Sequence, residues 1–413
     1  MERPDEVQPA RSPVGPAAAA RLIASRNFGP YFLGNALSAS GTWFQNLAGA
    51  LLVFRLTHSA FLLGVLNFAQ FVPVLVLAPW TGAAADRFDK RRLLVATQLT
   101  AVALSAGLAV LAWEGAARAW VVIAFALGLG VTSAFSAPAS QALLGWLVAP
   151  QELPSAVGLN SMTYNIARAV GPALAAVTVK TLGIPAAFAI NSASYLALVL
   201  ALAVVRPRAH EPRRERTRLR ESVRLVLENR RLLVFLAIVT AVGFASDPVN
   251  TLAPAFARAF HRPDTDSGFI IGAFGGGAVA AALLLAGRVA GSRRRMVSTL
   301  SLLGVGMIAF GVSPWLPVGY VLLGLAGFGY LAANTHATSR LQLEVEEAHR
   351  GRIMALWSVA FLGLRPLASI VDGAIASAAG VRVSAVVLAV PALACAAWVV
   401  ARGRAARAET VRA

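Results

Sequence analysis

The sequence contains little cysteine, little lysine and little charge. Its one cysteine, Cys395, excludes an internal disulfide bond and a cysteine-based metal site. Neither of the two lysines, Lys90 and Lys180, follows a glycine, so the chain lacks the phosphate-binding loop that a primary pump needs. It also lacks a His-Glu-x-x-His motif and a grouping of serine, histidine and aspartate. We therefore expect neither an enzyme nor a bound metal or cofactor.

Long apolar runs take the place of charge. Charged residues make up 14% of the 413 residues, whereas a soluble protein carries about 25%, and the mean hydropathy is +0.67. Runs that approach about 20 residues with almost no charge are typical of transmembrane helices. Twelve such spans fit the chain, at about 30–53, 60–80, 93–113, 119–140, 155–181, 185–205, 232–257, 268–287, 296–313, 316–338, 353–377 and 382–401. We expect an all-α polytopic membrane protein.

The basic residues are divided unevenly between the two sides of these spans. Of the 37 lysines and arginines, 29 lie in the tails and in the loops on the same side as the tails, 6 lie on the opposite side and 2 lie inside spans. Cytoplasmic loops of membrane proteins carry such an excess of positive charge. We therefore expect both termini in the cytoplasm and the chain in a bacterial inner membrane. This placement explains the net charge of +18 without a nucleic-acid partner, and we expect a monomer.

The longest polar stretch divides the spans into six and six. The predicted segments are a disordered cytoplasmic tail at 1–27, a six-helix bundle at 28–205, a cytoplasmic linker at 206–231, a second six-helix bundle at 232–402 and a cytoplasmic tail at 403–413. Four apolar residues of the linker fall on one helical face, namely Leu219, Val223, Val226 and Leu227. The linker is therefore either an amphipathic helix on the inner leaflet or a solvated connection.

A short charged loop joins the second and third predicted spans. Its key residues are Gly82, Asp86, Arg87, Lys90, Arg91 and Arg92. The glycine would permit a close approach of two helices, and the aspartate could cap the N-terminus of a neighbouring helix. The simpler alternative is a hairpin loop whose cations only orient the protein. The spacing of glycine, Asp-Arg pair and basic cluster resembles the loop motif between helices 2 and 3 of the major facilitator superfamily.

This resemblance implies two six-helix bundles with a substrate site between them near the middle of the membrane. It also implies that Asp86 braces the start of the eleventh span, near Arg350, Gly351 and Arg352, when the cytoplasmic side is closed. Two further stretches, Ser38–Gln45 with Leu56–Ala60 and Leu341–Met354, resemble the branch that contains the enterobactin exporter, macrolide efflux pumps and other transmembrane secretion effectors.

The branch implies that a proton gradient drives export of a small organic molecule, such as a drug, a siderophore or a secondary metabolite, by alternating access. Residues 167–175 resemble the Gly-Pro motif of drug–proton antiporters, but alanines replace most of its glycines. The arginine that those antiporters place in span 4 is missing here. An importer or a uniporter is an alternative, and so is a receptor-like or scaffold protein that uses the same fold without transport.

Polar residues form stripes along the first, fifth, seventh and tenth spans, whereas the third, sixth and ninth are almost featureless, as lipid-facing helices should be. Polar side chains inside a membrane are costly and tend to face a wet cavity. The predicted cavity-lining residues are Asn35, Thr42, Asn46, Tyr164, Asn165, Asn250, Thr251, Tyr330 and Asn334. The alternative is that these side chains hold the helices together by hydrogen bonds.

Four charges fall inside the spans: Arg168, Asp247, Arg365 and Asp372. Each needs a partner or water, because an unpaired charge there costs at least about 2.5–3.5 kcal/mol. Arginine does not release its proton, so a titrating group must be an aspartate. Asp372 follows Arg365 by seven residues on the same side of the eleventh span, and we expect it to be the permanent partner of that arginine. Asp247 is then the predicted proton site with Arg365 as its switchable neighbour, unless the charges form static ion pairs.

Overall fold

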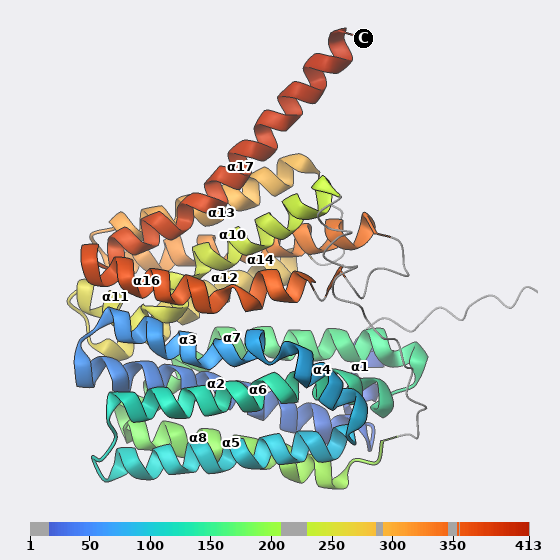
Figure 1. The fold of residues 1–413 in the computed structure, drawn as a ribbon, viewed down its shortest axis with the longest axis vertical. Helices are drawn as coiled ribbons and strands as arrows, with labels where there is room; N and C mark the ends of the chain where they lie inside the picture. The colour runs from blue at the N-terminus through green and yellow to red at the C-terminus, as the bar shows by residue number, and fades with distance from the viewer. Residues whose placement is uncertain (1–15, 208–228, 286–291, 346–352, 355, 413) are drawn as a thin grey trace, which may run out of the picture.

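The computed structural model describes residues 16–207, 229–285, 292–345, 353–354 and 356–412, and every regular element in these residues is helical (Figure 1). The N-terminal elements are α1 (Pro16–Ile23), α2 (Phe28–Thr57), α3 (Ala60–Val76), α4 (Ala78–Arg87), α5 (Lys90–Trp113), α6 (Ala119–Leu147), η1 (Pro150–Glu152), α7 (Leu153–Leu182) and α8 (Ile184–Val204). The C-terminal elements are α10 (Arg230–Thr251), α11 (Ala253–Ala259), η2 (Asp264–Asp266), α12 (Ser267–Leu284), α13 (Arg293–Val312), α14 (Leu316–Leu343), the π-helical η3 (Val359–Gly363), α16 (Arg365–Ala379) and α17 (Val381–Arg412).

The helices lie side by side in two groups, which Figure 1 shows one above the other. In the N-terminal group, α8 packs on α2 and α5, and in the C-terminal group α14 packs on α12 and α13. The change of group falls between α8 and α10, where the linker was predicted. Residues 208–228 of that linker lie outside the described residues, so its form and the domain boundaries remain predictions.

The long helices run between two ends of the bundle. We call the end at which α2 begins the basic end, because Arg206, Arg230 and Arg293 lie at helix ends there. We call the opposite end, at which α2 ends and α3 begins, the distal end. At the distal end α7 turns into α8 at Gly183, and α16 turns into α17 at Gly380. Both glycines have positive φ, +87° and +92°, which other residues rarely adopt, so the same turn recurs in each group.

Nine helices in the described part of the chain are long and apolar enough to cross a membrane. They coincide with nine of the predicted spans. The other three predicted spans coincide with α2 and α7, which carry the polar stripes, and with α3, an apolar helix of 17 residues. The chain is therefore a multi-pass helical membrane protein, and the count of twelve spans remains a prediction.

Small residues let the two groups approach closely in two places. An added Cβ at Gly275 of α12 would lie 2.5 Å from the Cα of Ala169 in α7, and one at Gly268 would lie 2.3 Å from the Pro172 carbonyl oxygen. An added Cβ at Gly64 of α3 would lie 2.4 Å from the Ser369 carbonyl oxygen in α16. Such contacts replace the hydrophobic effect as the cause of helix association within a membrane. They hold α7 against α12 and α3 against α16.

The structure corrects the predicted loop between the second and third spans. Residues 78–87 form the helix α4, and only Phe88 and Asp89 separate it from α5. Asp89 caps α5 by accepting a hydrogen bond from the Arg92 backbone at 2.7 Å. An added Cβ at Gly82 would meet nothing within 4 Å, so this glycine is not needed for a close helix approach. The Asp86 side chain and residues 350–352 lie outside what the structure describes, so the predicted brace remains a prediction.

The predicted disordered tail also contains structure. Residues 16–23 form α1, and Leu22 is buried against Phe28 and Tyr31 of α2. The run of four alanines at 17–20 favours a helix, because alanine has the highest helix propensity. Burial of Leu22 then supplies the packing that an isolated short helix lacks.

Candidate functional site

The most deeply buried ion pair among the described residues joins Asp247, four residues before the end of α10, to Arg365, the first residue of α16. Asp247 is only 1% exposed, and its Oδ1 lies 3.7 Å from Nε of Arg365, whose side chain is 19% exposed. Thr251 donates a hydrogen bond to Asp247 Oδ2 at 2.9 Å, and the Ser369 hydroxyl lies 3.4 Å from Oδ1. The carboxylate therefore has one arginine and two hydroxyl groups as partners, which compensates much of the cost of its burial.

Asp372 is not the partner of Arg365, contrary to expectation. It is fully buried, and its Oδ1 accepts a hydrogen bond from Ser384 of α17 at 2.5 Å. Seven residues of α-helix separate two side chains by about 10 Å along the axis, which is too far for an ion pair. Asp372 Oδ2 has no hydrogen-bond partner among the described residues.

Arg168 contacts a tyrosine, and no carboxylate partner for it lies in the part of the chain that the structure describes. Its Nη1 donates a hydrogen bond to the hydroxyl oxygen of Tyr330 in α14 at 2.7 Å, and its guanidinium carbon lies 4.5 Å from the centroid of the same ring. Cation–π contacts of this kind are favourable, more so where water is excluded. A buried tyrosine is therefore the partner that this intramembrane charge needs.

The two arginines occupy corresponding places in the two groups. Arg168 of α7 reaches across to Tyr330 of α14, and Arg365 of α16 reaches across to Phe71 of α3, with 4.5 Å from its guanidinium carbon to the ring centroid. Each group thus sends an arginine to an aromatic ring of the other near mid-length. The C-terminal group sends a further one, Arg258 of α11, whose guanidinium carbon lies 6.0 Å from the centroid of the Phe54 ring. Only Arg365 also contacts a carboxylate.

An ion pair between the two groups lies at the distal end, where no site was predicted. Arg55, near the end of α2, donates two hydrogen bonds to the Asp264 carboxylate in η2, at 2.5 and 2.9 Å. Bidentate pairs of this geometry are among the stronger charged interactions. The signal in the sequence was weak, because Arg55 is one of six cations on that side.

Three of the predicted cavity residues form hydrogen bonds within the N-terminal group. Asn35 donates to Asn160 of α7 at 2.6 Å, and Asn46 accepts from Gln70 of α3 at 2.7 Å. Thr42 lies 3.2 Å from the Tyr195 hydroxyl of α8. These contacts are those of the helix-joining alternative, and a cavity role for the three remains a prediction.

The expectation that the third and sixth spans are featureless is wrong. Gln45 Oε1 accepts hydrogen bonds from Ser105 of α5 and Asn191 of α8, at 3.2 and 3.0 Å, and both donors are fully buried. The three residues lie on separate helices with long gaps between them in the sequence, so no periodic pattern along one span marks the network.

The remaining predicted cavity residues lie on α7, α10 and α14. Asn250 and Asn334 each bury a side-chain carbonyl oxygen that has no partner among the described residues. Tyr164 is about half exposed, and Asn165 donates to the carbonyl oxygen of Ser161 one turn earlier in its own helix. Thr251 is hydrogen-bonded to Asp247, and Tyr330 is hydrogen-bonded to Arg168. Unpaired buried acceptors are costly, so among the predicted cavity residues Asn250 and Asn334 would gain most from a ligand or water.

Two residues of the predicted basic cluster link α5 to other helices of the N-terminal group at the basic end. The ammonium group of Lys90 lies 4.6 Å above the ring of Trp146 in α6, and Arg91 donates to the carbonyl oxygen of Ala203 at the end of α8 at 2.7 Å. The Arg91 bond satisfies a carbonyl that a helix end leaves unpaired. Arg87, at the end of α4, and Arg92, in the first turn of α5, are both exposed.

Residues 20–411 match the family model of the transmembrane secretion effectors. The chain is 29% identical to the staphyloferrin A transporter of Staphylococcus aureus over 54% of its own length and 57% of that protein, so this match spans little more than half of the relative. It is 22% identical to macrolide efflux protein A of Streptococcus pyogenes over 80% of this chain and 85% of that one. It is 25% identical to the multidrug efflux pump Tap of Mycobacterium tuberculosis over 88% and 91% of the two chains.

Solved structures show the same fold at low identity. A bacterial homologue of the human lysosomal transporter Spinster, in an inward-facing and occupied conformation, superimposes with a TM-score of 0.71 at 14% identity over 91% of this chain and 96% of that one. The nucleoside transporter NupG superimposes with a TM-score of 0.68 at 14% identity over 93% and 98%.

Proposed function

The chain belongs to the transmembrane secretion effector family of the major facilitator superfamily, a family of secondary transporters of small molecules, and from this premise we propose that it exports its cargo by alternating access in exchange for protons. The proposed setting is the bacterial inner membrane, with twelve spans and both termini in the cytoplasm.

The observation that carries the coupling proposal is the double attachment of Arg365. Its guanidinium group contacts Asp247 within the C-terminal group and Phe71 in the N-terminal group. A proton on Asp247 would remove the charge that holds Arg365, and the arginine would then be free to follow the N-terminal group or water. The protonation state of one carboxyl group would in this way bias the contact between the two halves, which is the requirement for coupling.

The contacts between the halves support an assignment of the conformational state. Among the described residues, the ion pair, hydrogen bonds and cation–π contacts that join the halves lie at the distal end or at mid-length: Arg55–Asp264, Arg258–Phe54, Arg168–Tyr330 and Arg365–Phe71. If the basic end is cytoplasmic, this is a state closed towards the outside, ready to receive cargo from the cytoplasm. Export requires such a state in its cycle.

The cargo belongs by proposal to the small organic molecules that give the relatives their names, macrolides and siderophores among them. A suitable ligand would offer a hydrogen-bond donor to Asn334 and a flat or apolar surface to Tyr330, one turn earlier in α14. Phe361 extends this surface, with its ring centroid 6.4 Å from that of Tyr330. Aromatic side chains with a few placed polar groups are typical of small-molecule sites.

Accumulation assays test the proposal and separate it from its rivals. Cells with and without the gene are loaded with a panel of macrolides, cationic dyes and staphyloferrin A, before and after a protonophore collapses the proton gradient. We expect at least one compound to accumulate less in cells that have the gene, and the difference to vanish with the gradient. A difference that survives collapse would indicate a uniporter, and higher accumulation would indicate an importer. Equal accumulation across the panel would favour the receptor-like or scaffold protein.

A further inference from the structure

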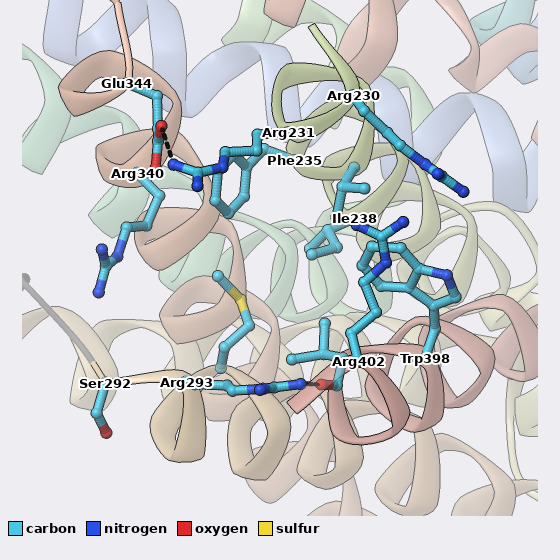
Figure 2. Close-up of a pocket in the computed structure, with 13 residues that line it drawn as sticks. Arg230, Arg231, Phe235, Ile238, Ser292, Arg293, Arg340, Glu344, Trp398 and Arg402 are labelled. Atoms are coloured by element: carbon cyan, nitrogen blue, oxygen red, sulfur yellow. Dashed lines mark hydrogen bonds and ion pairs between the residues drawn. The ribbon is translucent and has the colours of Figure 1, made fainter. Parts of the chain in front are cut away.

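A basic cavity lies within the C-terminal group, away from the contact between the halves. It occupies about 370 Å³ at the basic ends of α10, α13, α14 and α17. Figure 2 shows side chains from these four helices surrounding it, with Arg231 and Arg340 on one side and Arg402 on the other. Small-molecule sites have volumes of about 300–1,000 Å³, so the space admits a polar headgroup.

The cavity carries a large excess of positive charge. Its lining includes five arginines and one carboxylate, namely Arg230, Arg231, Arg293, Arg340, Arg402 and Glu344. Glu344 is 3.3 Å from Arg231, while Arg293 donates to the Val399 carbonyl oxygen. Arg230 and Arg402 form no ion pair within the part of the chain that the structure describes. Arginine guanidinium groups match phosphate oxygens in geometry as well as in charge, so the cavity suits a phosphate group.

The wall of the cavity is apolar, which a site for a free anion would not need. Val234, Phe235 and Ile238 of α10 lie opposite Met296 of α13 and Val399 of α17. Trp398 is 38% exposed at the rim, and Arg402 lies over its ring at 4.6 Å. Both residues lie in the last turn of the candidate membrane span of α17, Val381–Arg402. Tryptophan and arginine at that position are typical of the membrane–water interface, where lipid headgroups lie.

We propose that this cavity binds an anionic phospholipid, with its phosphate between Arg230 and Arg402 and its acyl chains along the apolar wall. Basic pockets between transmembrane helices on the cytoplasmic side have the chemistry for such headgroups. The bound lipid connects the ends of four helices of one half, so it stabilises that half as a rigid unit. The site is separate from Asp247 and Arg365 and does not depend on the proposed transport reaction.

Native mass spectrometry of the full chain in detergent tests the site, with phosphatidylglycerol and phosphatidylcholine as competing lipids. The test variant is Arg230→Gln with Arg402→Gln, and the matched control is Arg294→Gln, an exposed arginine in the first turn of α13 that does not line the cavity. We expect wild type and control to retain phosphatidylglycerol in preference to phosphatidylcholine. The double variant should bind phosphatidylglycerol about thirtyfold more weakly, because each of the two arginines near the headgroup contributes a factor of about five in affinity.

The conservative variant Arg230→Lys with Arg402→Lys should keep most of the preference, which excludes a folding defect as the cause of the loss. Equal retention by wild type and the double glutamine variant would overturn the proposal. So would displacement of the lipid by millimolar inorganic phosphate, because the cavity would then be a free-anion site. The double glutamine variant could also melt at a lower temperature in phosphatidylcholine while its lipid retention stays unchanged. That result would mean that an acidic segment of the chain, and not a lipid, occupies the cavity, and it would overturn the proposal.

Discussion

At the residue scale, the Arg55–Asp264 ion pair at the distal end directly links the two halves. Arg55 and Asp264 are partly exposed, with 43% and 23% of their side-chain surfaces accessible. Solvent screens such a pair, so it contributes about 0.2–1 kcal/mol despite its bidentate geometry. That is small against folding, but it changes the ratio of two states of similar free energy by up to about fivefold.

Arg55→Gln and Asp264→Asn should therefore each raise the fraction of molecules that are open at the distal end, and the double variant should open no further than either single one. Spin labels at Ala116 and Ala379, two exposed distal positions in different halves, report this as a longer inter-label distance in a chain without Cys395. Arg262→Gln is the matched control, because it breaks a 2.9 Å ion pair with Asp266 that lies inside one half. If Arg262→Gln lengthened the distance equally, the Arg55–Asp264 ion pair would not be what holds the distal end closed.

Sequence patterns could place the intramembrane charges but not all of their partners. An unpaired charge inside a membrane is costly, so Arg365 and Asp247 were each expected to have a partner. In the structure they form an ion pair with each other. The tyrosine beside Arg168 comes from a helix far away in the sequence, and the serine beside Asp372 comes from the following helix, α17. Nothing in the periodicity of one helix indicates which side chain of another helix meets it.

At the scale of elements, the glycine contact between α7 and α12 should control how closely the halves can meet. Gly275→Val would force a side chain into the Ala169 backbone, and overpacking of this kind costs about 1–3 kcal/mol. Gly276→Val is the matched control, since an added Cβ there meets nothing within 4 Å.

We expect the Gly275 variant, and not the Gly276 variant, to widen the distance between labels at Ala116 and Ala379. The two chains should express equally, because the cost falls on one conformational state rather than on each folded half. Identical distance distributions in the two variants would mean that the α7–α12 contact does not determine distal closure.

Helices that are uniformly apolar were predictable from the sequence. Helices that mix apolar and charged residues were not. The runs that became α5, α6 and α8 are apolar and end at charged or turn residues, so length and hydropathy suffice. The segment that became α4 mixes alanines with a charged cluster, and its charges suggested a loop. Helix propensity of the alanines prevailed, which moved the break to Phe88 and Asp89.

At the scale of the whole molecule, the distribution of charge predicts how the chain sits in the membrane. The sequence divides the basic residues 29 to 6, and those of the 29 that the structure describes, such as Arg206, Arg230 and Arg293, lie at the basic end. Reporter fusions at residue 215 should be cytoplasmic and those at residue 116 external, because short basic loops are retained inside. An external reporter at 215 would invert the transporter and turn the proposed export into import.

The overall architecture follows from sequence and resemblance, whereas its conformational state does not. Hydropathy gives the helices, and the repeated Gly183 and Gly380 turns fit two related halves. Which end is closed depends on contacts worth a few kcal/mol, such as Arg55–Asp264 and the packing at Gly64. Such contacts are exchanged during the cycle, so the sequence must be compatible with both states.

Proton-coupled uptake into proteoliposomes tests the central claim most directly. The cargo found by the accumulation assay is followed under an imposed pH gradient for wild type, Asp247→Asn and the matched variant Asp372→Asn, another buried aspartate without an arginine. We predict that Asp247→Asn abolishes gradient-driven accumulation while cargo exchange without a gradient continues, and that Asp372→Asn keeps its pH dependence. Gradient-driven accumulation by the Asp247→Asn protein with a normal pH dependence would contradict the account.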